Sequence, residues 1–67
     1  MRACDIVMAD GRIEYCVEVD GIVYPFSEEI RDHLMYVYTD EEIKSKFFGL
    51  PASTFPNIFY KESNVLH

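Results

Sequence analysis

Cys4, Cys16 and His33 are the residues whose side chains could act as a nucleophile, a base or a metal ligand. The two cysteines form no Cys-x-x-Cys motif, so a zinc site would need His33 and a carboxylate to complete it. Cysteine catalysis would need a thiol and a base together in one open cleft. We therefore expect no metal, no cofactor and no catalytic residue. We interpret Cys4 as a small buried residue and Cys16 as an incidental thiol.

Carboxylate pairs are the second kind of group that could carry acid–base chemistry. Glu14 and Glu18 are four residues apart, which is about 13 Å along a strand and too far for an acid–base couple. The acids at 28–29 and 40–42 lie in the first turns of two predicted helices. Negative side chains are stabilising there because they interact with the positive end of the helix dipole. The sequence has no motif typical of serine hydrolases, phosphate-binding loops, zinc proteases or calcium-binding loops. It therefore predicts a protein that is not an enzyme.

The acidic residues are more informative as a group. Twelve acids and six lysines or arginines give a net charge of −6, and every acid except Glu62 falls within residues 1–42. Nucleic-acid binding is driven by positive charge, so we expect no direct DNA or RNA binding, whereas an acidic surface steers a protein toward basic partners. The chain has no run of ~20 apolar residues and no recognisable signal peptide. We therefore expect a cytoplasmic protein without membrane contact.

Two Asp-Gly dipeptides, at 10–11 and 20–21, predict two β-hairpins, because Asp-Gly between alternating apolar residues favours a tight turn. If both are two-residue loops, Ile6 lies opposite Tyr15 and Tyr15 lies opposite Phe26. Directly opposed residues share one face of a sheet. The sequence therefore predicts a three-stranded antiparallel β-meander with a central strand at 12–19.

This register separates an apolar face from a polar one. The apolar face would consist of Cys4, Ile6, Met8, Ile13, Tyr15, Val17, Val19, Ile22, Tyr24 and Phe26. The outer face would carry Asp5, Glu14, Glu18 and Cys16. Because it places Cys4 and Cys16 on opposite faces, this register excludes a disulfide between them.

The rest of the chain predicts short helices and an aromatic end. Ser27 reads as the N-cap of a helix at about 28–38, which would lay Ile30, Leu34, Val37 and Tyr38 on the sheet. Thr39 and Glu42 have the spacing of a capping box and predict a second short helix. We expect the aromatic segment 50–60 to pack back on the domain or on a second subunit. Residues 62–67 are expected to be frayed.

Two short segments resemble known families. Gly21-x-Val23-Tyr24-x-Phe26, followed by a helix, resembles the KTSC domain, a small β-rich domain. The run 47–51, Phe-Phe-Gly-Leu-Pro, is similar to a run in a small phage anti-CRISPR protein that combines an antiparallel sheet with helices. Neither resemblance assigns a function to any residue.

Together these patterns predict one α+β domain over 1–67, with one or two short helices on one face of the meander. We expect a non-enzymatic acidic module that binds a larger basic protein, as an anti-CRISPR-like or other anti-defence inhibitor encoded by a phage or mobile element would. The candidate partner-binding residues are Asp5, Glu14, Glu18, Met35 and Tyr36. The alternative is a homodimer or larger homo-oligomer of unknown function. Its self-interface candidates are Phe47, Phe48, Phe55 and Phe59.

Overall fold

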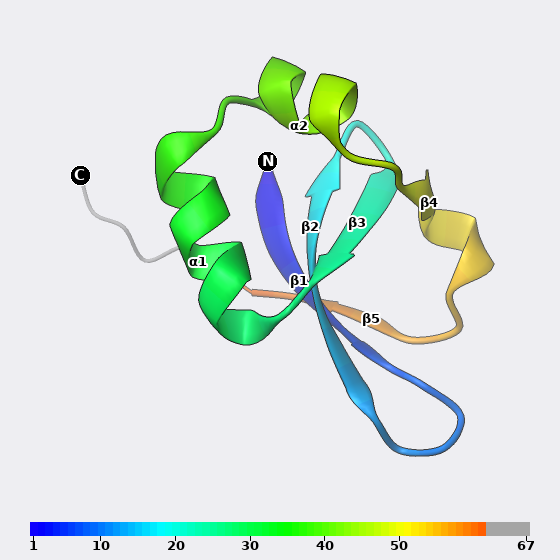
Figure 1. Cartoon of the computed structure of the whole chain (residues 1–67). Coiled ribbons are helices and arrows are strands. Elements are labelled where there is room, and N and C mark those ends of the chain that lie inside the picture. The colour runs from blue at the N-terminus through cyan, green and yellow to red at the C-terminus, as the bar shows by residue number, and fades with distance from the viewer. Residues whose placement is uncertain (62–67) are drawn as a thin grey trace.

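A computed structural model describes residues 1–61 and shows a small α+β fold, which confirms the predicted class (Figure 1). The predicted fraying of 62–67 lies outside the described residues. In chain order the elements are β1 (Arg2–Val7), β2 (Ile13–Val19), β3 (Ile22–Phe26), α1 (Glu28–Val37), α2 (Asp40–Lys46), β4 (Leu50–Pro51), the 3-10 turn η1 (Ala52–Thr54) and β5 (Ile58–Tyr60).

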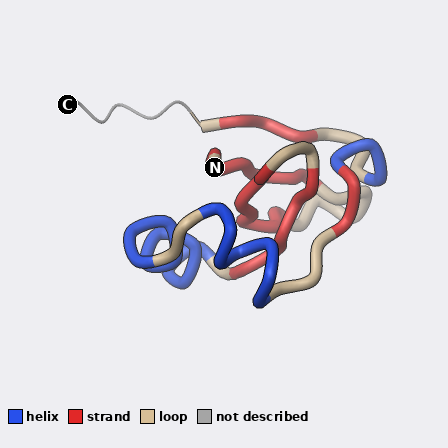
Figure 2. The backbone as a smooth tube through the Cα atoms, turned by 90° about the horizontal axis from the view of Figure 1, so that it is seen from above, coloured by secondary structure: helices blue, strands red, loops and turns tan. Residues whose placement is uncertain are grey.

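The sheet has five antiparallel strands in the order β4-β3-β2-β1-β5, rather than the three that the sequence predicted. The two extra strands are short and come from the segment after α2, so β4 extends the sheet beside β3 and β5 extends it beside β1. Figure 2 shows α1 and α2 gathered on one side of the strands. The chain after α2 therefore frames the sheet at both edges.

The second Asp-Gly dipeptide forms the predicted two-residue turn. Asp20 and Gly21 both have positive φ, 52° and 83°, as a type I′ turn requires. The Glu18 carboxylate accepts a hydrogen bond of 2.7 Å from the Gly21 amide and holds this turn. Tyr15 lies opposite Phe26, so the predicted register between β2 and β3 is confirmed.

The first Asp-Gly dipeptide forms a different turn, and the register predicted for β1 is wrong by one residue. Gly11 alone in this loop has positive φ, 90°, and the Gly11 amide donates to the Met8 carbonyl at 2.9 Å. The Met8 amide donates to the Arg12 carbonyl at 2.8 Å, so the loop has three residues and a glycine bulge. Tyr15 consequently lies opposite Asp5 instead of Ile6.

This shift changes which residues of β1 face the helices. Cys4 lies directly opposite Cys16, so both cysteines are on the same face, contrary to the prediction. Asp5 moves from the predicted outer face to the helix face. The sequence also predicted a polar outer face, whereas the middle of that face is buried.

Two buried clusters result, one on each face of the sheet. The helix-side cluster consists of Val17, Val19, Tyr24, Leu34 and Ile43. The cluster on the opposite face consists of Cys4, Ile6, Cys16 and Val23, with Met8, Ala52, Phe55 and Ile58 packed against it. The segment after β4 thus covers the face that the sequence left exposed to solvent.

Both helices begin where the sequence predicted, but α1 is rotated relative to the prediction. The Ser27 side chain caps α1, and Thr39 and Glu42 form the predicted capping box of α2. The α1 residues that are buried are Arg31 and Leu34, whereas Ile30 is about half exposed. The predicted face counted Tyr38 as a helical residue, but α1 ends at Val37. Tyr38 reaches the core from an extended backbone, so its burial does not determine which side of α1 faces the sheet.

Gly49 lets the chain after α2 lie close to β3. An added Cβ at Gly49 would lie 2.7 Å from both the Ile22 side chain and the Val23 carbonyl oxygen. Since such distances are far below van der Waals contact, only glycine fits here. Glycine at this position therefore permits β4 to pair with β3.

The register of β1 predicts the reactivity of the two thiols. Because Cys4 and Cys16 are both fully buried, iodoacetamide should label neither in the folded protein and both after unfolding in denaturant. Mass spectrometry of the alkylated protein measures this directly. Rapid labelling of Cys16 in the folded state would show that the cysteine lies on an exposed face and would contradict the register.

Candidate protein-docking surface

An ion pair between a buried arginine and a partly buried aspartate connects α1 to β1. Arg31 is 1% exposed, and its Nη1 donates to Asp5 Oδ1 at 2.6 Å and to the Cys4 carbonyl at 3.2 Å. The guanidinium also lies 5.3 Å from the centre of the Tyr15 ring, in cation–π range. The predicted docking residue Asp5 therefore lies on the helix face and neutralises a buried arginine.

The sequence missed Arg31 because arginine is seldom buried unless it is paired. Its position three residues before Leu34 and four before Met35 places it on the inner face of α1. This spacing could have placed Arg31 on the buried face of the helix. The apolar residues Ile30 and Val37 instead indicated a different buried face.

Glu14 and Glu18 do lie on the face opposite the helices, as predicted, but both are already paired within the chain. Arg12 Nη1 donates to Glu14 at 3.0 Å, and Arg2 Nε donates to Glu18 at 3.2 Å. The Glu18 side chain is only 12% exposed and also holds the turn after β2. These contacts make Glu18 a structural residue and leave Glu14 as the more accessible of the two.

The helix face of the sheet is not fully covered by the helices. Figure 1 shows the β1–β2 hairpin extending beyond α1 and α2. Val7 lies opposite Ile13, and Asp5 lies opposite both Tyr15 and Phe59, so these side chains share that face. We call Val7, Ile13, Tyr15 and Phe59 the open sheet face. Ile13 is 48% exposed and Phe59 is 59% exposed, and neither belongs to a buried cluster.

Acidic residues border the open sheet face. Asp10 lies in the hairpin loop between β1 and β2, three residues before Ile13, and is paired with Arg12 at 2.8 Å. Glu28 and Glu29 begin α1, directly after the strand that carries Phe26, the partner of Tyr15. Both glutamates are exposed, and among the contacts of residues 1–61 neither makes a salt bridge. An apolar centre with a charged rim is the arrangement of a protein interface.

The remaining predicted interface residues divide into packed and exposed ones. Met35 packs against the helix-side cluster, whereas Tyr36 is 88% exposed. Phe47 packs edge-to-face on Phe26 with the ring centres 5.1 Å apart. Phe55 packs against the buried cluster that contains Cys4 and Cys16. Of the four phenylalanines predicted to form a self-interface, Phe48 and Phe59 are therefore the exposed ones.

The two cysteines lie opposite each other and are fully buried. The hydrogen bond between their side chains lowers the pKa of the Cys4 thiol and, together with burial, raises the pKa of the Cys16 thiol. Burial limits the access of reagents to both thiols. His33 is exposed on α1, and no group of three potential metal ligands comes together within residues 1–61.

No helix in the described part of the chain is both long and apolar enough to cross a membrane. Comparison with models of known protein families, with curated proteins and with solved structures finds no significant match.

The Asp5–Arg31 pair predicts a large effect on stability. Replacing Asp5 with alanine would leave a buried arginine without its carboxylate, and we expect Asp5→Ala to lower the free energy of unfolding by about 3 kcal/mol. The exposed pairs of Lys44 with Asp20 and Glu41 provide the control, and Lys44→Ala should cost below about 1 kcal/mol. Urea denaturation measures both variants. Equal small losses would show that the Asp5–Arg31 contact does not hold α1 on the sheet.

Proposed function

We propose that the chain is a non-enzymatic module that binds a larger, basic protein through the open sheet face. The observation that carries this proposal is the exposed apolar group of Ile13 and Phe59 at a place where the sheet has no helix over it. Large apolar and aromatic side chains at the centre of an interface supply most of its binding energy. Tyr15 beside them adds an aromatic ring whose centre lies 5.3 Å from the Arg31 guanidinium.

Charge indicates the kind of partner. Glu28 and Glu29 make no salt bridge within residues 1–61 and belong to a chain with a net charge of −6, so a basic surface would complement this face. A second copy of the same face would bring these carboxylates against one another, which disfavours self-association here. A setting that fits such chemistry is inhibition of a nucleic-acid-handling protein, where the carboxylates would occupy phosphate sites, as in a phage or mobile-element inhibitor of host defence.

The alternative proposal is self-association through the aromatic segment of 47–60. It is supported by Phe48, which is 86% exposed and lies on a different part of the surface from the open sheet face. A homo-oligomer would show a melting temperature that rises with protein concentration, whereas a monomeric binding module would not.

Variants of the open sheet face test the first proposal. Immobilised protein is incubated with bacterial lysate at low and high salt, and retained proteins are identified by mass spectrometry. We expect Phe59→Ala and Ile13→Ser each to weaken capture of a basic protein by roughly tenfold or more, because each removes apolar contact at the interface centre. Phe48→Ala, an equally exposed aromatic substitution elsewhere, should leave capture unchanged.

Charge provides the second arm of this test. The double variant Glu28→Gln and Glu29→Gln should slow association and reduce its dependence on salt. If the captured proteins are the same for wild type and for both open-face variants, the open sheet face is not the docking surface. If the protein forms a concentration-dependent dimer that Phe48→Ala alone abolishes, self-association replaces docking through the open sheet face as the proposed function.

A further inference from the structure

Arg31 has hydrogen-bonding capacity that the protein does not use. Its Nη1 carries both the bond to Asp5 and the bond to the Cys4 carbonyl. Its Nε is buried and has no hydrogen-bond partner within residues 1–61. The nearest carboxylate oxygen, Asp32 Oδ1, lies 3.7 Å away, which is beyond hydrogen-bonding distance. A buried N–H without a partner is costly, and such groups in native structures are often completed by a ligand or ion.

The free part of the guanidinium is the edge formed by Nε and Nη2. The N–H groups on this edge are parallel and match the two oxygens of a carboxylate or phosphate. Asp5 and the Cys4 carbonyl are both bound at Nη1, so Nε and Nη2 make no hydrogen bond within residues 1–61. Arg31 is thus held by one carboxylate while two parallel donors keep their hydrogen-bonding capacity.

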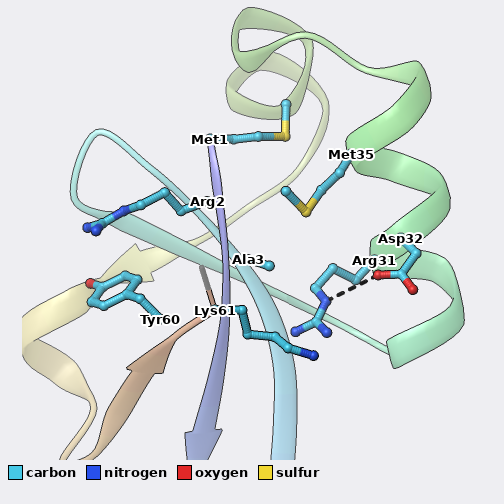
Figure 3. Close-up of a pocket in the computed structure, with 8 residues that line it drawn as sticks. All are labelled: Met1, Arg2, Ala3, Arg31, Asp32, Met35, Tyr60 and Lys61. Carbon is cyan, nitrogen blue, oxygen red and sulfur yellow. Dashed lines mark ion pairs between the residues drawn. The ribbon is translucent and has the colours of Figure 1, made fainter. Parts of the chain in front are cut away.

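Arg31 lines a pocket of about 430 Å³ between the start of β1, α1 and the end of β5. That volume lies within the range of small-molecule sites, about 300–1,000 Å³. Figure 3 shows the Arg31 guanidinium and the Lys61 ammonium directed into the space between β1 and α1. Met35 reaches into the same space from α1 and gives it an apolar side.

The pocket concentrates positive charge in an acidic protein. Three of the chain's six lysines and arginines line it, namely Arg2, Arg31 and Lys61. Arg2 lies at the far end, 3.8 Å from the centre of the Tyr60 ring and paired with Glu18. The one acidic side chain in the lining is Asp32, which is 76% exposed. Arg31 is paired with Asp5 and Arg2 with Glu18, so Lys61 is the lining cation that makes no salt bridge within residues 1–61.

We propose that this pocket binds the oxyanion head of a small organic acid. The Nε and Nη2 groups of Arg31 hold two oxygens of the head, Lys61 supplies the second positive charge, and Met35 contacts the apolar body of the ligand. The site is separate from the open sheet face and does not depend on the protein-binding proposal. A carboxylate and a phosphate monoester share the required chemistry.

Titration of the Arg31 Nε–H resonance in ¹H–¹⁵N NMR spectra tests the site directly. The probes are benzoate, phenyl phosphate and the neutral isostere benzamide, each added to the full-length, untagged protein. Benzoate or phenyl phosphate should shift this resonance saturably in the millimolar range, and the tighter of the two identifies the head group. Benzamide should leave it unchanged because it lacks the charge that pairs with Arg31.

Three variants distinguish a built site from general attraction of anions. Lys61→Gln should weaken binding about fivefold, whereas Lys46→Gln, which removes the same charge from the exposed end of α2, should not change it. Asp32→Asn should strengthen binding several-fold, because it removes the carboxylate nearest to Nε. No saturable shift with either anion, an equal shift with benzamide, or an equal effect of Lys61→Gln and Lys46→Gln would each overturn the proposal.

Discussion

The backbone of Gly11 determines which residues of β1 face the helices. Its positive φ of 90° closes a three-residue loop with a bulge, one residue longer than the loop that the same Asp-Gly dipeptide forms after β2. Because side chains alternate along a strand, one extra residue moves all of β1 to the opposite face. Asp5 is thereby placed beneath α1, and Cys4 is placed beside Cys16.

The two proposed sites follow from that placement. With Asp5 on the helix face, Arg31 of α1 is buried against β1 with a carboxylate to balance its charge, and its guanidinium lies near the Tyr15 ring. On one side of this ion pair the sheet continues past the helices as the open sheet face. On its other side Arg31 lines the pocket that ends at Lys61. One buried arginine thus lies between the open sheet face and the pocket.

Local signals in the sequence predicted local structure well. Ser27, Thr39 and Glu42 mark the helix starts because capping depends on neighbouring residues, and Asp20-Gly21 fixes its turn for the same reason. The Asp10-Gly11 dipeptide fits two loop lengths, so the sequence could not choose the register of β1. The pairing of β5 with β1 joins residues more than fifty positions apart, and no local pattern predicts it. The candidate site was missed for the same reason, since Arg31, Tyr15 and Phe59 meet only through that register and that pairing.

Nuclear Overhauser effects between α-protons of β1 and β2 report the register of this hairpin. In an antiparallel pair the α-protons of residues between the hydrogen-bonded pairs lie close together. The Met8–Arg12 hydrogen bond places Asp5 and Tyr15 in such a pair. We therefore expect a strong contact between the α-protons of Asp5 and Tyr15. A contact of Tyr15 with Ile6 instead would show the two-residue register, in which Asp5 lies on the face away from Arg31, and would contradict the placement of Asp5 beneath α1.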